Sequence, residues 1–165
     1  MEAYAETEPR AFVPVRVVGL GNEILADDAF GILVARQIER LFPDRFQVVE
    51  SSAAGFDLLD HLLGARHVIL VDTVMTGAAP PGTIRVFSAA EIPPGGGIAP
   101  HFFGLAEALA LGKQLHLDVA EDAVVIAVEA ADCTTLGGAM HPDVRCAIGG
   151  AVDLVRLAAA PPVPR

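Results

Sequence analysis

The sequence predicts a three-layer α/β/α sandwich with a mixed, mostly parallel sheet of about five strands. Three observations predict this fold class. Segment 13–20 is rich in β-branched residues and leads through a glycine-rich turn into apolar residues at helical spacing. The alternation of strand and helix then continues to residue 72, in the order βαβαβ. Finally, about ten residues separate the apolar runs 67–72 and 83–88, too few for a usual helical crossover.

The elements of the first half follow from hydrophobic spacing. After the strand at 13–20, the helical positions are Phe30, Leu33, Val34, Ile38 and Leu41. Segment 46–50 predicts a second strand. Segment 55–64 predicts a short helix that ends at Gly64 and faces inward through Phe56, Leu59, Leu62 and Leu63. Segment 67–72 is a continuous apolar run, which is typical of a strand covered on both faces.

The second half begins with a strand at 83–88, which should run antiparallel to the strand at 67–72 if the two pair directly. A loop rich in glycine and proline occupies 91–101, and a helix is expected near 102–113. A strand at 123–130 and a last helix near 142–158 complete the domain. The apolar face of that last helix consists of Val144, Ile148, Ala151, Val152 and Val155.

Composition limits the classes of function. We expect one domain over residues 1–165, with flexible tails at 1–12 and 158–165. The two cysteines form no CxxC pair and the first ten residues do not resemble a signal peptide, so we expect a cytoplasmic protein. No apolar stretch is long enough for membrane insertion. The formal net charge of -10 argues against a nucleic-acid partner.

The turn GLGNEILADDAFG at 19–31 does not have the pattern of a phosphate-binding loop. Ile24 stands where a dinucleotide fingerprint needs glycine, and the lysine of a P-loop is absent from the segment. Asp27 and Asp28 are expected in the first helical turn, where their charges oppose a phosphate and favour a cation. Asp27 alone also fits a simple role as a helix cap.

Two further residues can join Asp28 at one edge of the sheet. Asp72 ends the buried strand, at the same edge as the turn after the first strand. The loop before His101 is long enough to bring this imidazole to the same place. Two carboxylates and one imidazole suit a borderline divalent metal such as nickel, zinc or manganese. Taken singly, Asp72 also fits a strand-end cap and His101 a helix N-terminal residue.

Six collinear segments resemble the [NiFe]-hydrogenase maturation endopeptidases. They are GLGN (19–22) followed by DDAFG (27–31), AAGFDLL (53–59), VILVDTV (68–74), PGTIRVF (81–87) and PHFFGLAEAL (100–109). The resemblance extends roughly over residues 14 to 157 and depends on the order and spacing of all the segments. Two departures are Glu50, Ser51 and Ser52, where the family often has an aspartate and paired glycines, and Phe102, where glutamine is frequent.

The resemblance implies an endopeptidase that removes a short C-terminal extension from the hydrogenase large-subunit precursor after nickel insertion. It implies that Asp28, Asp72 and His101 serve in both metal recognition and catalysis. The nickel is then supplied by the substrate, and no organic cofactor is expected. Gly19, Gly21 and Asn22 form the turn that the substrate approaches.

Two alternative functions use the same three ligands. One is a peptidase with a resident zinc ion, since an open fourth position on zinc can activate water. The other is a nickel-binding hydrogenase assembly factor without proteolytic activity. No serine or cysteine nucleophile is evident, because Ser51 and Ser52 lack a GxSxG elbow and Cys133 has no evident partner.

Overall fold

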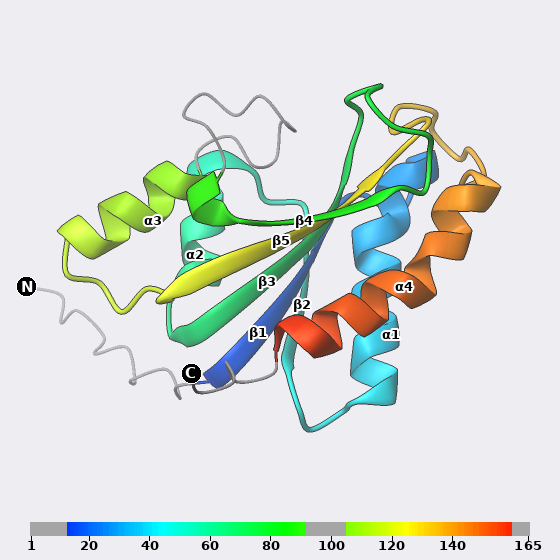
Figure 1. Ribbon diagram of the computed structural model, residues 1–165. Helices are drawn as coiled ribbons and strands as arrows, with labels where there is room; N and C mark the ends of the chain where they lie inside the picture. Colours follow the sequence, from blue (N-terminus) through cyan, green and yellow to red (C-terminus); the bar gives the residue numbers. More distant parts are fainter. Residues whose placement is uncertain (1–12, 92–104, 160–165) are drawn as a thin grey trace, which may run out of the picture.

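Among the described residues, five strands form one mixed sheet (Figure 1). The computed structural model describes residues 13–91 and 105–159. The strands are β1 (Val13–Leu20), β2 (Gln47–Ser51), β3 (Ala65–Val74), β4 (Ile84–Ser88) and β5 (Asp122–Glu129). Their order is β2-β1-β3-β5-β4, and every neighbouring pair is parallel except β5 and β4. The predicted fold class is confirmed.

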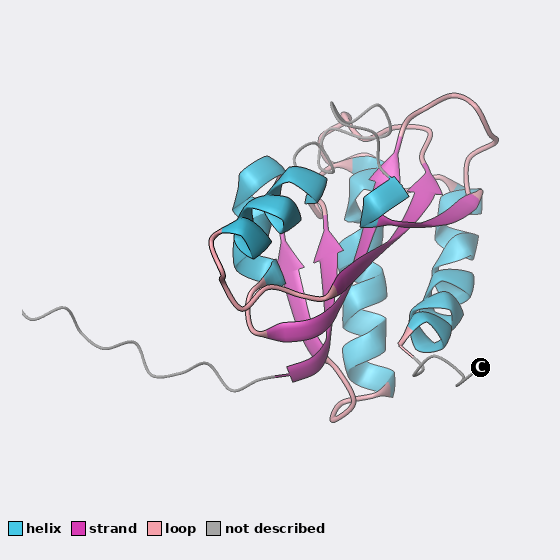
Figure 2. Ribbon diagram, turned by 60° about the vertical axis from the view of Figure 1, so that its left-hand side comes forward, coloured by secondary structure: helices cyan, strands magenta, loops and turns pink. Residues whose placement is uncertain are grey.

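Helices cover both faces of this sheet (Figures 1 and 2). One face carries α1 (Phe30–Leu41) and α4 (Pro142–Ala158), and the other carries α2 (Leu59–Leu62) and α3 (Leu105–Gln114). The 3₁₀ helices η1 (Ala26–Ala29) and η2 (Gly55–Leu58) lead into α1 and α2, and η3 (Ala89–Glu91) follows β4. Within the described ranges, no helix combines the length and apolar character needed to cross a bilayer.

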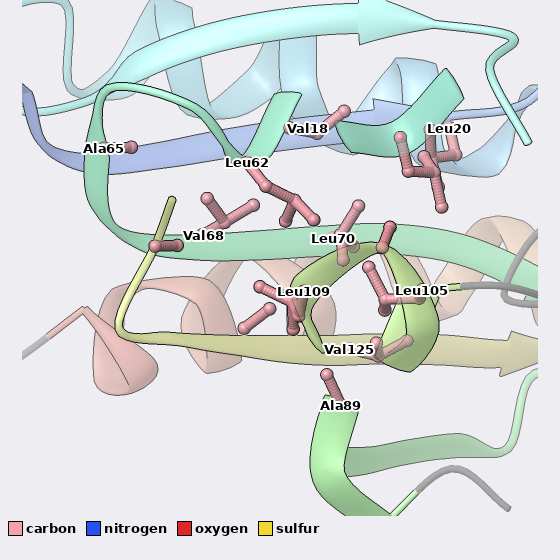
Figure 3. Packing of buried hydrophobic residues seen from close by; sticks show 14 of the residues in the cluster. Val18, Leu20, Leu62, Ala65, Val68, Leu70, Ala89, Leu105, Leu109 and Val125 are labelled. Carbon is pink, nitrogen blue, oxygen red and sulfur yellow. The ribbon is translucent and has the colours of Figure 1, made fainter. Parts of the chain in front are cut away.

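The central strands contribute to two hydrophobic clusters, because successive side chains of a strand point to opposite faces. Val18 and Leu70 pack in the cluster that includes Leu105 of α3 (Figure 3). The preceding residues, Val17 and Ile69, belong to the cluster on the α1 and α4 face. The continuous apolar run of β3 is thus explained, as the sequence indicates, by burial of this strand on both faces of the sheet.

The strand β4 is antiparallel, but its partner is β5 and not β3. Both edges of β3 are already occupied, by β1 and β5, in parallel pairing. The short connection therefore takes the chain past the position of β5 to the edge of the sheet. Direct pairing of the segments 67–72 and 83–88, considered from the sequence, does not occur.

The segment 55–64 differs from its prediction. It consists of the 3₁₀ turn η2 followed by the single turn α2, and Phe56 is 56% exposed while Leu58 is fully buried. A 3₁₀ turn has about three residues per turn, so it changes the phase that an α-helical pattern assumes. The inward position of Phe56 was wrong for this reason. Gly64 follows the helix with a φ of 71°, as a terminating glycine should.

The other elements agree with their predicted ranges to within a few residues. The last helix covers Pro142–Ala158, so residue 158 belongs to α4 and not to a tail. α3 starts at Leu105, and the predicted start of that helix near 102 lies outside the described residues. So do most of the loop at 91–101, the predicted tail at 1–12, and residues 160–165 of the predicted tail at 158–165.

Candidate active site

The turn after β1 lies beside the end of β3 at one edge of the sheet. The two strands are parallel neighbours, with Gly19 opposite Val71 in the register. Gly21 continues the connection to β2, because its N–H donates to the carbonyl of Ser51 over 3.1 Å. Parallel strands present their carboxyl ends together, and this is the usual place for sites in such sheets.

The glycines of the turn are required by close contacts within the protein itself. A Cβ at Gly19 would overlap the carbonyl oxygen of Gly31, at the start of α1. Gly21 has a φ of 137°, and a Cβ there would overlap the carbonyl oxygen of Asp28. The missing side chains therefore let β1 approach α1 and let the turn approach the backbone of Asp28.

Asn22 stabilises the same turn through its side chain and its backbone. Its Oδ1 accepts a hydrogen bond from the N–H of Ile24 at 3.2 Å, which is an Asx-type arrangement. Its own N–H donates to the carbonyl of Asp28 at 3.3 Å. The turn and Asp28 are thus connected at two points, Gly21 by contact and Asn22 by hydrogen bonding.

Asp28 and Asp72 share Thr73 as a hydrogen-bond donor. The hydroxyl of Thr73 donates to Asp28 Oδ1 at 3.2 Å, and its backbone N–H donates to Asp72 Oδ1 at 2.7 Å. All three residues are buried, with 6% of Asp28, none of Asp72 and 5% of Thr73 exposed. Two carboxylates from η1 and β3 therefore lie around one threonine at the carboxyl edge of the sheet.

Cys133 extends this group from the segment after β5. Its Sγ donates to Thr73 Oγ1 at 3.4 Å, and the thiol is partly buried. Burial raises the pKa of Cys133 to about 11, and the nearby charges of Asp28, Asp27 and Asp72 act in the same direction. The group is therefore a neutral thiol at pH 7, which fits a donor to a hydroxyl oxygen and not an activated nucleophile.

Asp27 does not cap a helix. The N-cap residue of η1 is Leu25, and the Asp27 side chain points toward the segment between β5 and α4. There Oδ2 accepts from the N–H groups of Ala131 and Asp132 at 2.8 and 3.0 Å, and Oδ1 accepts from the N–H of His141 at 2.6 Å. Of the roles that the sequence left open for Asp27, the simple capping role is not the one observed, because these distant donors satisfy its carboxylate instead.

An open pocket of about 340 Å³ adjoins the turn. Its lining residues are Gly21, Asn22, Glu23, Ile32, Arg36, Glu50, Ser51 and Ser52. Arg36 crosses this region as a clamp, because its guanidinium lies 2.7 Å from Glu23 and 2.8 Å from Glu50. These hydrogen bonds raise the pKa of Arg36. Glu50, Ser51 and Ser52, which depart from the family pattern at the end of β2, are thus among the residues that line the pocket.

His101, the third predicted ligand, lies outside the described residues. In the described part of the chain, no three His, Cys, Asp or Glu side chains gather closely enough to hold a metal ion. The structure thus brings Asp28 and Asp72 to the same threonine, together with the turn of Gly19, Gly21 and Asn22.

Sequence reasoning missed two buried polar residues, Thr73 and Glu129. Thr73 looks like an ordinary β-branched strand residue. Glu129 ends β5 and is 2% exposed, and it accepts from the N–H and hydroxyl of Thr76 and from the N–H of Gly77. Although burial acts to raise it, these hydrogen bonds hold the pKa of Glu129 below its ordinary value. A charged residue that ends an otherwise apolar strand was the available signal.

Comparisons with known proteins agree on one family. The family model HycI, described as hydrogenase maturation protease, matches residues 32–157, a range that includes Asp72 and His101 and begins after Asp28. Hydrogenase 2 maturation protease of Escherichia coli is 30% identical over 99 residues, which cover 58% of this chain and 60% of that protein. Hydrogenase expression/formation protein HoxM of Cupriavidus necator is 28% identical over 160 residues, or 92% of this chain and 78% of that protein. The chain thus spans less than two thirds of the first of these relatives.

Solved structures have the same fold. The hydrogenase maturating endopeptidase HybD from Escherichia coli matches with a TM-score of 0.74 and 25% identity, over 88% of this chain and 91% of that one. The [NiFe] hydrogenase maturation protease HybD from Thermococcus kodakarensis matches with a TM-score of 0.70 and 24% identity, over 90% and 100% of the two chains. At 24% identity, the match to the Thermococcus kodakarensis protein shows a shared fold and nothing more.

Proposed function

Because the chain belongs to the hydrogenase maturation protease family, we propose that it is an endopeptidase for a [NiFe]-hydrogenase large-subunit precursor. In this proposal it removes the C-terminal extension of the precursor after nickel insertion, in the cytoplasm. The observation that carries the proposal is the pair of buried carboxylates, Asp28 and Asp72, which share Thr73 at the carboxyl edge of the sheet.

The nickel is part of the substrate in this reaction. Carboxylate oxygens and one imidazole nitrogen suit a borderline divalent cation, and Asp28, Asp72 and His101 supply that set. The burial of Asp28 and Asp72 supports this role. Their attraction to a cation is less screened than that of carboxylates on an open surface. A precursor without nickel would lack the group that these side chains recognise.

Cleavage of the extension requires an attacking water molecule and a group that accepts its proton. A carboxylate of Asp28 or Asp72 can accept that proton at the edge of the sheet. Bound nickel can supply Lewis-acid polarisation of the peptide carbonyl. The open pocket lined by Gly21 and Asn22 offers room for the peptide, and the backbones of these two residues contact the carbonyl of Asp28.

A processing assay with nickel-loaded and nickel-free precursor tests the proposal. Wild-type protein should shorten the nickel-loaded precursor and leave the nickel-free form largely uncut. His101→Ala should retain near-wild-type thermal stability but lose both binding and cleavage of the nickel-loaded form, because two carboxylates alone are a harder and less complete ligand set for nickel.

Metal analysis of the purified protein completes the experiment. Efficient cleavage of nickel-free precursor by a protein that carries stoichiometric zinc would contradict recognition of substrate nickel and indicate a resident-zinc peptidase. Binding of the nickel-loaded precursor without any shortening would indicate an assembly factor without proteolytic activity.

A further inference from the structure

Thr73 occupies the position between the two carboxylates of the candidate site. We propose that Thr73 is a positioning residue that sets the relative orientation of Asp28 and Asp72 for the nickel-bearing substrate, an inference that rests on the proposed function. Its hydroxyl reaches Asp28 Oδ1 at 3.2 Å and its backbone N–H reaches Asp72 Oδ1 at 2.7 Å. Groups that orient ligands in this way influence metal affinity without touching the metal.

The chemistry of these donors suits the task. Asp28 and Asp72 carry like charges on neighbouring elements, and their repulsion opposes a fixed arrangement. A hydroxyl and an amide are neutral donors, so Thr73 can hold both carboxylates without cancelling the negative charge that a cation requires. The β-branched side chain of threonine also has restricted rotation on a strand, which fixes the direction of its hydroxyl oxygen.

Cys133 gives the hydroxyl of Thr73 a defined proton direction. A hydroxyl has one proton, and the thiol of Cys133 donates to its oxygen at 3.4 Å. Because one lone pair of the Thr73 hydroxyl oxygen accepts this hydrogen bond, the hydroxyl proton is directed to Asp28 Oδ1. The chain of donors thus runs from Cys133 through Thr73 to Asp28, and Cys133 acts at one remove from the carboxylate.

Four variants separate the hydroxyl from the bulk of the side chain. Thr73→Val keeps the shape and the backbone N–H but removes the hydroxyl, whereas Thr73→Ser keeps the hydroxyl. Cys133→Ala removes the first donor of the chain. Thr83→Val is the matched control, because the hydroxyl of Thr83 donates to the carbonyl of Pro80 and to neither carboxylate.

The readouts are thermal unfolding, affinity for nickel-loaded precursor and for Ni²⁺ alone, and the separate values of kcat and KM. Thr73→Val should bind nickel-loaded precursor more weakly by on the order of 10- to 100-fold. Thr73→Ser should restore most of that affinity, and Cys133→Ala should lose less than Thr73→Val does. Thr83→Val should bind and cleave as the wild type.

Three outcomes would overturn the positioning role. They are wild-type affinity and cleavage in Thr73→Val, a folded Thr73→Ser as defective as Thr73→Val, and loss of folding in Thr73→Val while Thr73→Ser folds. The last result would assign the hydroxyl to stability instead. Asp72→Asn distinguishes failure of this inference from failure of the proposed function, because normal cleavage by Asp72→Asn would contradict the proposed site itself.

Discussion

Asp27 and Asp28 are adjacent in the chain, yet their carboxylates bind to different parts of the protein. Asp27 accepts hydrogen bonds from the backbone N–H groups of residues 131, 132 and 141. Asp28 accepts a hydrogen bond from the hydroxyl of Thr73 in β3. The Asp27 carboxylate thus connects η1 to the segment between β5 and α4, whereas the Asp28 carboxylate lies at the candidate site.

Replacement of these two aspartates by asparagine should therefore have different effects. Asp27→Asn places an amide NH₂ against backbone donors and should lower the free energy of unfolding by about 3 kcal/mol. Asp28→Asn should change stability by less than about 1 kcal/mol but abolish cleavage of nickel-loaded precursor. Chemical denaturation and the processing assay give both quantities. Equal stability losses in the two variants would contradict the division of roles.

Gly21→Ala should impair both folding and processing, because the new Cβ would overlap the carbonyl oxygen of Asp28. The expected loss of stability is about 1 to 3 kcal/mol, as for other strained backbone positions. Gly77→Ala is the control, since Gly77 also has a positive φ but its Cβ would meet nothing within 4 Å. Gly77→Ala should cleave normally, and normal cleavage by Gly21→Ala as well would show that the turn tolerates displacement of Asp28.

His61 should make stability depend on pH. Burial and the charge of Arg16 lower its pKa below the ordinary 6.5, while Asp60 acts in the opposite direction. The unfolded chain therefore binds the proton more readily, and stability should fall as the pH drops below about 6.5. The free energy of unfolding of His61→Gln, measured over the same range, should show a flatter dependence. Parallel curves for the two proteins would assign the effect to other groups.

The two cysteines should differ in reactivity. The pKa of Cys133 is raised to about 11, and Cys146 is exposed on α4. Because the thiolate is the reactive form, iodoacetamide at about pH 8 should modify Cys146 well before Cys133. Mass spectrometry of the peptides over time measures the two rates in one sample, and Cys146→Ser confirms the assignment. Faster modification of Cys133 than of Cys146 would contradict the conclusion that Cys133 is a neutral thiol.

Gly149→Ala should stabilise the protein. Gly149 lies inside α4, is exposed, and has open space where a Cβ would be. Alanine at such a position should raise the free energy of unfolding by about 0.5 to 1 kcal/mol. Cleavage should not change, because the residue is outside the candidate site. A decrease in the melting temperature would show a packing constraint on α4.

The sequence predicted the fold because its strands and long helices have clear apolar patterns. The continuous run of β3 and the helical spacing in α4 are examples. The partner of β4 depended on which edge of the sheet remained free, and the exposure of Phe56 depended on a local 3₁₀ turn. Neither is encoded in hydrophobic periodicity.

The candidate site was predictable to a smaller extent. Asp28 and Asp72 could be placed near one edge, since parallel strands present their carboxyl ends together. The partners of Asp27 are more than a hundred residues away, and so its interaction with the segment after β5 required the tertiary structure. Thr73 and Cys133 meet only through the packing of β3 against that distant segment.

The place of β4 at the edge of the sheet affects how the chain folds during synthesis. In the described part of the protein β4 pairs with β5, which the ribosome adds later, after α3. At ordinary elongation rates this interval lasts on the order of seconds. We therefore expect β4, which contains the apolar residue Val86, to wait for β5 during synthesis, while β1, β2 and β3 can already associate. This interval is the stage at which a chaperone would protect the chain from aggregation.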